Sequence, residues 1–234
     1  MPFFLDKRDT TSHEWMDDPD CSHAELVNTY RQFSTINAMI SGWSKIYRHY
    51  IRPACKDRKK RYSLLDIGFG GGDIPIKLAK WAARDGITLD ITAIETDRRA
   101  VDFVQTLNTP PNIDFLHRSS TEILKQGKSF DWVISNHLLH HLGKTELRKL
   151  LSEARELSTT GVLFNDIERS DVGYALFTIF SRPVFRSSFI THDGLTSIKR
   201  SYTLGELKTQ APDDWNVQRL FPFRLLLHYN HANK

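Results

Sequence analysis

The chain has 234 residues, 40% of them hydrophobic and 26% charged, which is ordinary for a globular protein and allows one sizeable α/β domain. Its two cysteines lie far apart without CxxC spacing, which argues against a disulfide scaffold or a zinc site and favours a reducing, cytoplasmic compartment. No apolar run approaches the roughly 20 residues that cross a bilayer, and a net charge of +4 does not by itself indicate a nucleic-acid partner.

The N-terminal part is expected to be a polar arm followed by a helical cap. Ser22 and Glu25 resemble a capping box, and apolar residues then recur at helical spacing. A second helix should end before Pro53, because a proline disfavours helical backbone in the residue that precedes it. We therefore divide the chain into an arm and cap at residues 1–52 and a main domain at residues 53–234.

A short basic run precedes the first predicted strand. Its members are Lys56, Arg58, Lys59, Lys60 and Arg61. Such a run is most often a solvated linker, and the alternative is a surface that contacts phosphates.

Strand and helix patterns alternate through the middle of the chain. The short apolar runs predicted as strands are residues 63–67, 89–94, 113–116, 132–135 and 162–164. Helical patterns lie between them at residues 73–86, 98–107 and 147–157, the first of them capped by Asp73. Repeated β-α-β units predict a Rossmann-like, mostly parallel sheet with helices on both faces.

The alternation breaks after the fifth strand. Residues 168–200 are expected to form an insertion with a helix near residues 172–180 and a loop at His192–Gly194. Thr203 and Glu206 form a capping box for another helix. Residues 215–220 and 223–229 then predict an antiparallel hairpin at the edge of the sheet, which makes seven strands in all.

The turn after the first strand carries the strongest functional signal. It reads LLDIGFGGGDIP, with Asp66 two residues before Gly68 and further glycines at Gly70 and Gly72. Glycines let a ligand approach the backbone closely, and a helix N-terminus follows. A carboxylate at Asp66 would repel a pyrophosphate but suits a ligand that carries an ammonium and a sulfonium group.

This turn resembles the first motif of class I S-adenosylmethionine-dependent methyltransferases. The resemblance implies S-adenosyl-L-methionine as cofactor, with Glu95 binding the ribose hydroxyls and Ser119 standing where relatives place an aspartate near the adenine. The residues that it assigns to the cofactor site are Asp66, Gly68, Gly70, Gly72, Asp73, Glu95, Thr96, Ser119, Ser120 and Asn136. Asp97 is an alternative to Glu95.

The stretch FDWVISNHLLHHL at residues 130–142 resembles a further motif of small-molecule members of the same family. It supplies three candidate catalytic histidines, His137, His140 and His141, of which adjacent His140 and His141 are not expected to face the cleft together. It lacks the Asn-Pro-Pro-Tyr type arrangement of enzymes that methylate bases, which makes nucleic acid an improbable substrate. No metal is expected, because the position of an aspartate in magnesium-dependent relatives reads Ser-Asn-His.

The resemblance extends to ubiquinone/menaquinone-type and polyketide-associated phenolic O-methyltransferases, and implies a phenolic, quinone-like or polyketide-derived small-molecule acceptor. Asn165 and Asp166 are expected at the edge of the cleft. Two hypotheses remain beside it: an RNA or protein methyltransferase, and a cofactor-binding domain without catalysis. In the insertion, His192 and Asp193 would orient an acceptor or merely form a turn, and the aromatic residues would form a lid or core: Phe177, Phe180, Phe185 and Phe189.

Overall fold

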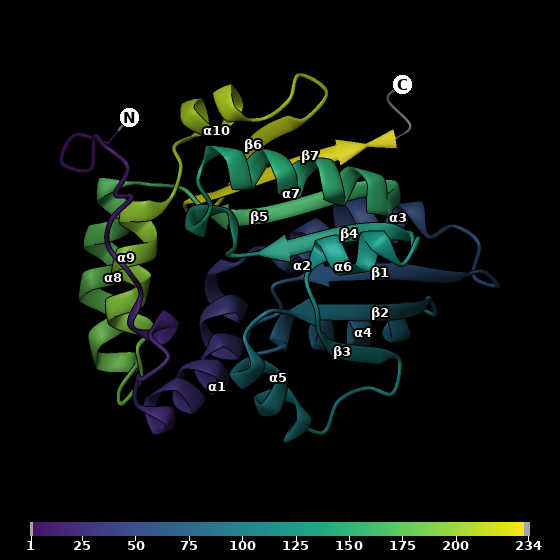
Figure 1. Cartoon of the computed structure of the whole chain (residues 1–234), viewed down its shortest axis with the longest axis horizontal. Coiled ribbons are helices and arrows are strands. Elements are labelled where there is room, and N and C mark those ends of the chain that lie inside the picture. The colour runs from purple at the N-terminus through teal and green to yellow at the C-terminus, as the bar shows by residue number, and fades with distance from the viewer. Residues whose placement is uncertain (1, 232–234) are drawn as a thin grey trace.

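The computed structural model describes residues 2–231 and contains one seven-stranded sheet in the order β3-β2-β1-β4-β5-β7-β6 (Figure 1). The strands are β1 (Arg61–Ile67), β2 (Thr88–Glu95), β3 (Ile113–His117), β4 (Phe130–Asn136), β5 (Ser158–Ile167), β6 (Asn216–Leu220) and β7 (Arg224–Asn230). β1 to β5 pair in parallel, and β7 runs antiparallel to both β5 and β6. The predicted fold class, including the hairpin at the edge, is confirmed.

Helices cover both faces of the sheet because neighbouring strand residues point to opposite sides. Leu64 packs with α4 (Asp73–Arg84) and α5 (Arg98–Gln105), whereas Leu65 packs on the other face with α7 (Lys144–Leu157). The second face also carries α6 (Ser120–Lys125) and α10 (Leu204–Gln210). The sequence reading missed α6, although Ser119 and Glu122 form a complete capping box at its start.

The N-terminal cap packs on the first of these faces. It comprises α1 (His23–Ile40), α2 (Trp43–Ile46), a π-helical turn η2 (Tyr47–Ile51) and α3 (Arg52–Ala54). The expected end before Pro53 is wrong, since the helix continues to Ala54. The backbone N–H of Arg52 donates to the Tyr47 carbonyl five residues back, and this wider turn relieves the contact that a proline ring makes with the preceding turn.

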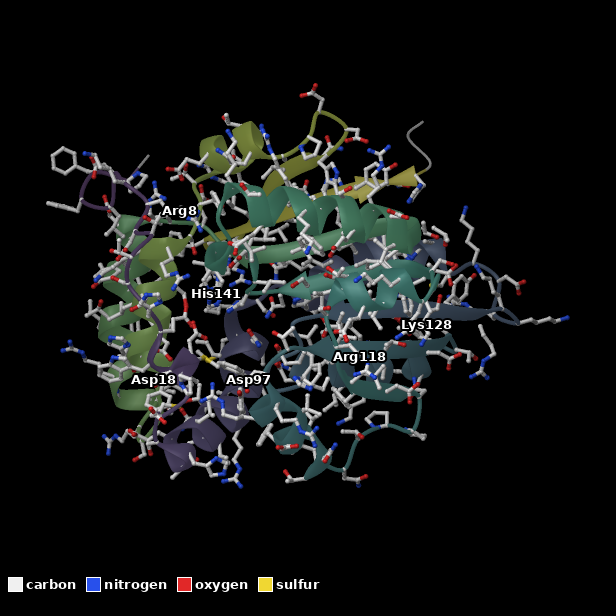
Figure 2. The ribbon with its side chains drawn as sticks, viewed as in Figure 1. Arg8, Asp18, Asp97, Arg118, Lys128 and His141 are labelled. Carbon is white, nitrogen blue, oxygen red and sulfur yellow. The ribbon has the colours of Figure 1, made fainter. Side chains whose placement is uncertain are left out.

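The polar arm before α1 is held at several points along its length. Arg8 donates to the carbonyls of His140 and Leu142, and the buried Arg169 donates to the carbonyl of Leu5 at 2.8 Å. The arm includes the short turn η1 (Trp15–Asp17) and runs beside α8 (Asp171–Val184) and α9 (Ile190–Arg200) (Figure 1). Arg8 and His141 mark where it passes the end of the sheet (Figure 2).

The insertion forms two paired helices, α8 (Asp171–Val184) and α9 (Ile190–Arg200), with η3 (Leu139–His141) next to α9. The loop expected at His192–Gly194 is wrong, because these residues lie in the first turns of α9. An Asp-Gly pair is a common turn signal. Here Gly194 instead lets α9 approach α8, since a Cβ on it would lie 2.4 Å from Phe177 Cε1. None of the helices within residues 2–231 is both long and apolar enough to span a membrane.

Candidate active site

The glycine-rich turn links β1 to α4 with a backbone that requires glycine. Gly68, Gly70 and Gly72 have φ angles of 76°, 52° and 73°, a region that side chains with a Cβ rarely adopt. Gly71 lies so close to α1 that a Cβ would be 2.7 Å from the Tyr30 carbonyl oxygen. The expected cap is corrected: Gly72 is the N-cap of α4 and Asp73 its first residue.

Asp66 is a buried carboxylate without a partner. Its exposed fraction is 1%, and neither carboxylate oxygen makes a hydrogen bond. Burial, together with the negative charges of Asp73 and Glu95, raises the pKa of Asp66 well above its usual value. The ionised form of Asp66 would be an unpaired buried charge, which is costly, and a cationic ligand at this position would offset that cost.

Glu95 stands at the end of β2 facing the same turn. Its carboxylate accepts hydrogen bonds from the backbone N–H of Gly70 at 3.2 Å and of Thr96 at 2.7 Å. Asp73 is held by Asn37 and Lys77, which donate to its two oxygens at 3.0 and 2.8 Å. The acidic groups around the turn therefore differ: Glu95 and Asp73 have donors, and Asp66 has none.

One cavity of about 640 Å³ runs from this turn to the insertion. The predicted site residues that line it are Asp66, Gly68, Gly70, Asp73, Glu95, Asn136, His137, His140 and His141. Asp97, the alternative to Glu95, lines it too. The carboxyl ends of β1, β2 and β4 thus meet at a single cleft, as expected for open parallel sheets.

Four predicted residues do not line the cavity: Gly72, Thr96, Ser119 and Ser120. Ser119 caps α6, and its hydroxyl donates to Glu122 at 2.9 Å. The Ser120 hydroxyl donates to Glu153 at 2.6 Å. Both hydroxyls are therefore engaged in holding α6, and this geometry lends no support to the contact with adenine, which stays a prediction.

β4 ends in a strained turn beside a buried arginine. His137 has a φ of 61°, which is uncommon for a residue with a side chain. Arg224 of β7 is 1% exposed and donates to His137 Nε2 at 2.6 Å and to Asn136 Oδ1 at 3.2 Å. Burial and the Arg224 charge lower the pKa of His137 well below its usual value. His137 is therefore neutral, and its Nε2 lone pair is already occupied.

His140 is enclosed by two carboxylates. Its Nδ1 lies 2.8 Å from Asp166 Oδ1, and its Nε2 lies 3.3 Å from Glu14 Oε1. Burial by itself would lower the pKa of His140, but Asp166 and Glu14 outweigh it and raise this pKa to about 9. Asp166, expected at the edge of the cleft, is 3% exposed and orients the imidazole from behind.

His141 faces the cavity next to His140, with ring centroids 4.2 Å apart. The expectation that only one of the two faces the cleft is wrong, because they belong to the 3₁₀ turn η3 and Glu14 reaches both. Burial and the neighbouring charge of His140 lower the pKa of His141 to about 4. His141 Nδ1 lies 3.6 Å from Asp17 Oδ2.

Glu14, Asp17 and Arg224 are cavity residues that the sequence reading missed. Burial would raise the pKa of Glu14, but His140 and His141 lower it to about 2, so Glu14 is ionised. Nothing in the local sequence around these residues marks them. They reach the site only because the arm and β7 return to the carboxyl ends of the central strands.

The far part of the cavity is an apolar chamber between α1, α8 and α9. Its wall includes Ile36, Met39, Ile40, Leu176, Phe177, Phe180, Val184, Ile190, Ile198 and Phe223. Met39 and Phe180 are 66% and 64% exposed, so the apolar surface continues to the mouth. Phe177, Phe180 and Phe185 of the insertion line the cavity, and Phe189 is buried beside it. Asp193 also lines it, but its carboxylate accepts from the backbone N–H of Trp15 and Met16.

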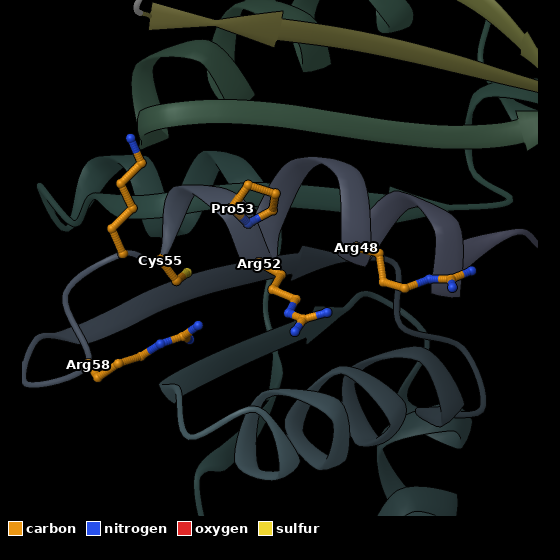
Figure 3. A pocket seen from close by; sticks show the side chains of 6 residues that line it. Arg48, Arg52, Pro53, Cys55 and Arg58 are labelled. Carbon is orange, nitrogen blue, oxygen red and sulfur yellow. The ribbon is translucent and has the colours of Figure 1, made fainter.

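The basic run lies at the opposite end of the sheet. Lys60 and Arg61 pair with Asp131 and Asp90 at 2.6 and 2.7 Å. Two other members of the run, Lys56 and Arg58, line a groove of about 310 Å³ together with Arg48, Arg52, Pro53 and Cys55 (Figure 3). This groove is next to the amino end of β1, whereas the cavity begins at its carboxyl end.

Part of the chain is similar to a known protein family, and its fold is similar to that of several solved structures. Residues 64–161 match the family model described as a methyltransferase domain. No curated protein sequence matches the chain. Among solved structures, the plantazolicin methyltransferase BpumL in complex with SAH has 14% identity and a TM-score of 0.65, with 92% of each chain covered.

Two further structures have the same fold. Human N-acetylserotonin methyltransferase in complex with SAM has 14% identity and a TM-score of 0.58, covering 89% of this chain and 56% of that one. A SAM-dependent methyltransferase from Aquifex aeolicus has 14% identity and a TM-score of 0.56, covering 86% and 96%. The family match thus covers residues 64–161, and the solved structures show that the chain has the fold of S-adenosylmethionine-dependent methyltransferases.

Proposed function

We propose that this protein transfers a methyl group from S-adenosylmethionine to a small, largely apolar acceptor, of the phenolic, quinone-like or polyketide-derived kind, in the chamber between α1, α8 and α9. One observation supports this most: a single cavity joins the unpaired Asp66 carboxylate, the apolar chamber and the histidines. The donor's ammonium group would pair with Asp66, and Glu95 would accept from the ribose hydroxyls.

The shape of the cavity supports positioning as the main catalytic contribution. Methyl transfer from a sulfonium needs donor and nucleophile in line and water excluded. α1 covers the glycine-rich turn, and the Phe177 and Phe180 side chains line the acceptor end. His140, His141 and Glu14 line the same cavity, so an ionisable group of the acceptor would be able to reach them there.

The structure favours a small-molecule acceptor over RNA. The basic groove of Figure 3 lies at the other end of the sheet, so a nucleic acid bound there would not present a base to the cavity. The cavity wall is mostly apolar, which suits an aromatic or aliphatic acceptor. The acceptors named for two proteins of the same fold, plantazolicin and N-acetylserotonin, are not nucleic acids either.

Calorimetry with S-adenosylhomocysteine and NAD tests the cofactor half of the proposal. We expect micromolar binding of the first ligand and none of the second, because Asp66 would repel a pyrophosphate. Equal binding of NAD would contradict the proposal.

A transfer assay with labelled methyl donor and a panel of phenols and hydroxyquinones tests the acceptor half. Turnover of one of them, with none on total RNA, is the expected result. Cofactor binding without turnover on any acceptor would favour the cofactor-binding domain without catalysis, and turnover on RNA alone would favour the other alternative.

A further inference from the structure

Three potential metal ligands from two distant parts of the chain converge at the wall of the cavity. Glu14 comes from the N-terminal arm, and His140 and His141 come from η3 after β4. One ligand atom of each lies within 4.8 Å of those of the other two. Neither the sequence spacing nor the methyltransferase motifs bring Glu14 to these histidines; the arm does.

The second observation is an imidazole nitrogen that has no hydrogen bond. His140 is 1% exposed, and its Nε2 is buried without a hydrogen-bond partner, although Glu14 Oε1 is 3.3 Å away. Its other nitrogen, Nδ1, is 2.8 Å from Asp166 Oδ1. A carboxylate on one ring nitrogen fixes the orientation of the imidazole and is the usual support behind a histidine that binds a metal through the other nitrogen.

Two of the three spacings between these atoms are close to those around a tetrahedral ion. Bonds of about 2.0–2.2 Å to zinc place neighbouring ligand atoms roughly 3.3–3.6 Å apart. Glu14 Oε1 lies 3.3 Å from His140 Nε2 and 3.8 Å from His141 Nε2. We propose that Glu14, His140 and His141 bind a divalent zinc-class cation, with Asp166 as the outer carboxylate.

The surroundings of this cluster suit a cation with one open coordination position. All three ligands line the cavity, so a cation held by them could be reached from the cavity. The Ser197 hydroxyl donates to Glu14 Oε1 at 2.6 Å and holds the carboxylate in place. The charged groups that act on the three ligands or on Asp166 include Asp17, Asp193, Arg8, Arg200 and Arg224.

A catalytic role for a cation here deepens the proposed function and rests on it. The open position would take an oxygen, nitrogen or sulfur atom of the acceptor and favour its deprotonated form, with the proton leaving to solvent. Two patterns in the sequence argued against a metal: the spacing of the cysteines and the missing aspartate of the magnesium motif. Neither pattern includes a carboxylate from residue 14.

Metal binding can be measured on the whole chain without acceptor or methyl donor. The protein is stripped with chelator, equilibrated with Zn²⁺, passed over a desalting column and analysed for metal. We expect about one zinc per chain in the wild type and little in His141→Ala and Glu14→Gln. Replacement by Co²⁺ should give the visible absorption bands of a four- or five-coordinate ion, and these should vanish in both variants.

His49→Gln is the matched control, because His49 is exposed on η2 and lies away from the cavity. It should retain the zinc of the wild type. Asp166→Asn should weaken zinc binding about 10- to 100-fold, the usual effect of removing an outer carboxylate. Circular dichroism establishes that each variant is folded, and binding of S-adenosylhomocysteine separates failure of this proposal from failure of the proposed function.

Two results would overturn the proposal. One is a wild-type protein that binds S-adenosylhomocysteine but keeps no zinc after desalting, in which case a proton alone occupies the gap between His140 and Glu14. The other is equal zinc content in wild type and His141→Ala, which would place the metal elsewhere, for example on exposed histidines.

Discussion

The two halves of the cavity are built in different ways. In the proposed function one half of the cavity binds the cofactor and the other binds the acceptor. The cofactor half lies at the carboxyl ends of strands: the glycine-rich turn after β1, Glu95 as the last residue of β2 and Asn136 as the last residue of β4. The acceptor half comes from the N-terminal arm, α1, the paired helices α8 and α9, and Arg224 of β7. Local sequence dictates the first half, and long-range packing assembles the second.

This difference suggests that the two halves can be damaged separately. Changes in the arm or in α8 and α9 should alter stability and acceptor binding while leaving the cofactor affinity intact. Changes in the glycine-rich turn or at Glu95 should lower the cofactor affinity while leaving acceptor binding intact. Three substitutions and one pH titration would test this separation, with expected effects that decrease from the first to the last.

Arg169→Ala should loosen the acceptor half most. The buried guanidinium donates to the carbonyls of Leu5 and Ser201 and to Glu206. Its loss leaves buried acceptors without donors and should cost roughly 3 kcal/mol of unfolding free energy, measured by urea titration. Arg155→Ala breaks the half-exposed pair with Asp214 and the contact of the guanidinium with the Tyr229 ring, and it should cost less than about 1 kcal/mol. Equal costs would show that the arm contributes little to the fold.

Glu95→Ala should weaken the binding of S-adenosylhomocysteine by about 1.5–3 kcal/mol, because charged hydrogen bonds to the ribose are lost. Calorimetry gives the affinity directly. The control is Asp90→Ala on the same strand, where the carboxylate pairs with Arg61 at the far end of the sheet; its affinity should equal that of the wild type. An unchanged affinity in Glu95→Ala would remove this residue from the cofactor half.

Gly194→Ala should act on the acceptor half alone. The added methyl group would overlap Phe177 and force α8 and α9 apart, at a cost of about 1–3 kcal/mol. The acceptor KM should rise while the affinity for S-adenosylhomocysteine stays constant. Gly205→Ala in α10 adds the same group in open space and should raise the stability by about 0.5–1 kcal/mol. A parallel loss of cofactor affinity in Gly194→Ala would show that the halves are coupled.

The pH dependence of cofactor binding should report Asp66. The pKa of Asp66 is raised in the free protein by burial and by Asp73 and Glu95, whereas the ligand's ammonium group favours the ionised form. The affinity for S-adenosylhomocysteine should therefore fall as the pH drops through this pKa, by at most about tenfold per pH unit, with release of a proton on binding. Calorimetry in buffers of different ionisation enthalpy measures that proton.

Asp66→Asn is the matched variant for this experiment. This variant should remove the pH dependence of S-adenosylhomocysteine binding and should weaken that binding at high pH. Because the folded-state pKa lies above the unfolded one, Asp66 destabilises the free fold as the pH rises between them. The neutral variant should therefore be more stable than the wild type above that interval, a trade of stability against function. A variant with lower stability there would contradict the assignment of Asp66 as an unpaired charge.

The sequence by itself determined the sheet, its mostly parallel order with the antiparallel hairpin, and the turn that faces the cofactor half. Apolar runs of strand length, turn residues and capping boxes are local signals, and each acts within about ten residues. The error at Pro53 and the missed α6 are also local, since a π-helical turn and the Ser119 capping box decide them.

Only the tertiary structure decided the acceptor half. Glu14 lies 126 residues before His140 in the chain (140 − 14), yet its carboxylate is 3.3 Å from that imidazole. Arg224 likewise comes from a distant strand and donates to His137. In α9 an apparent Asp-Gly turn is helical instead, because Gly194 packs on Phe177. Burial and charge pairing between distant segments fix these positions, and no periodicity or spacing within one segment carries that information.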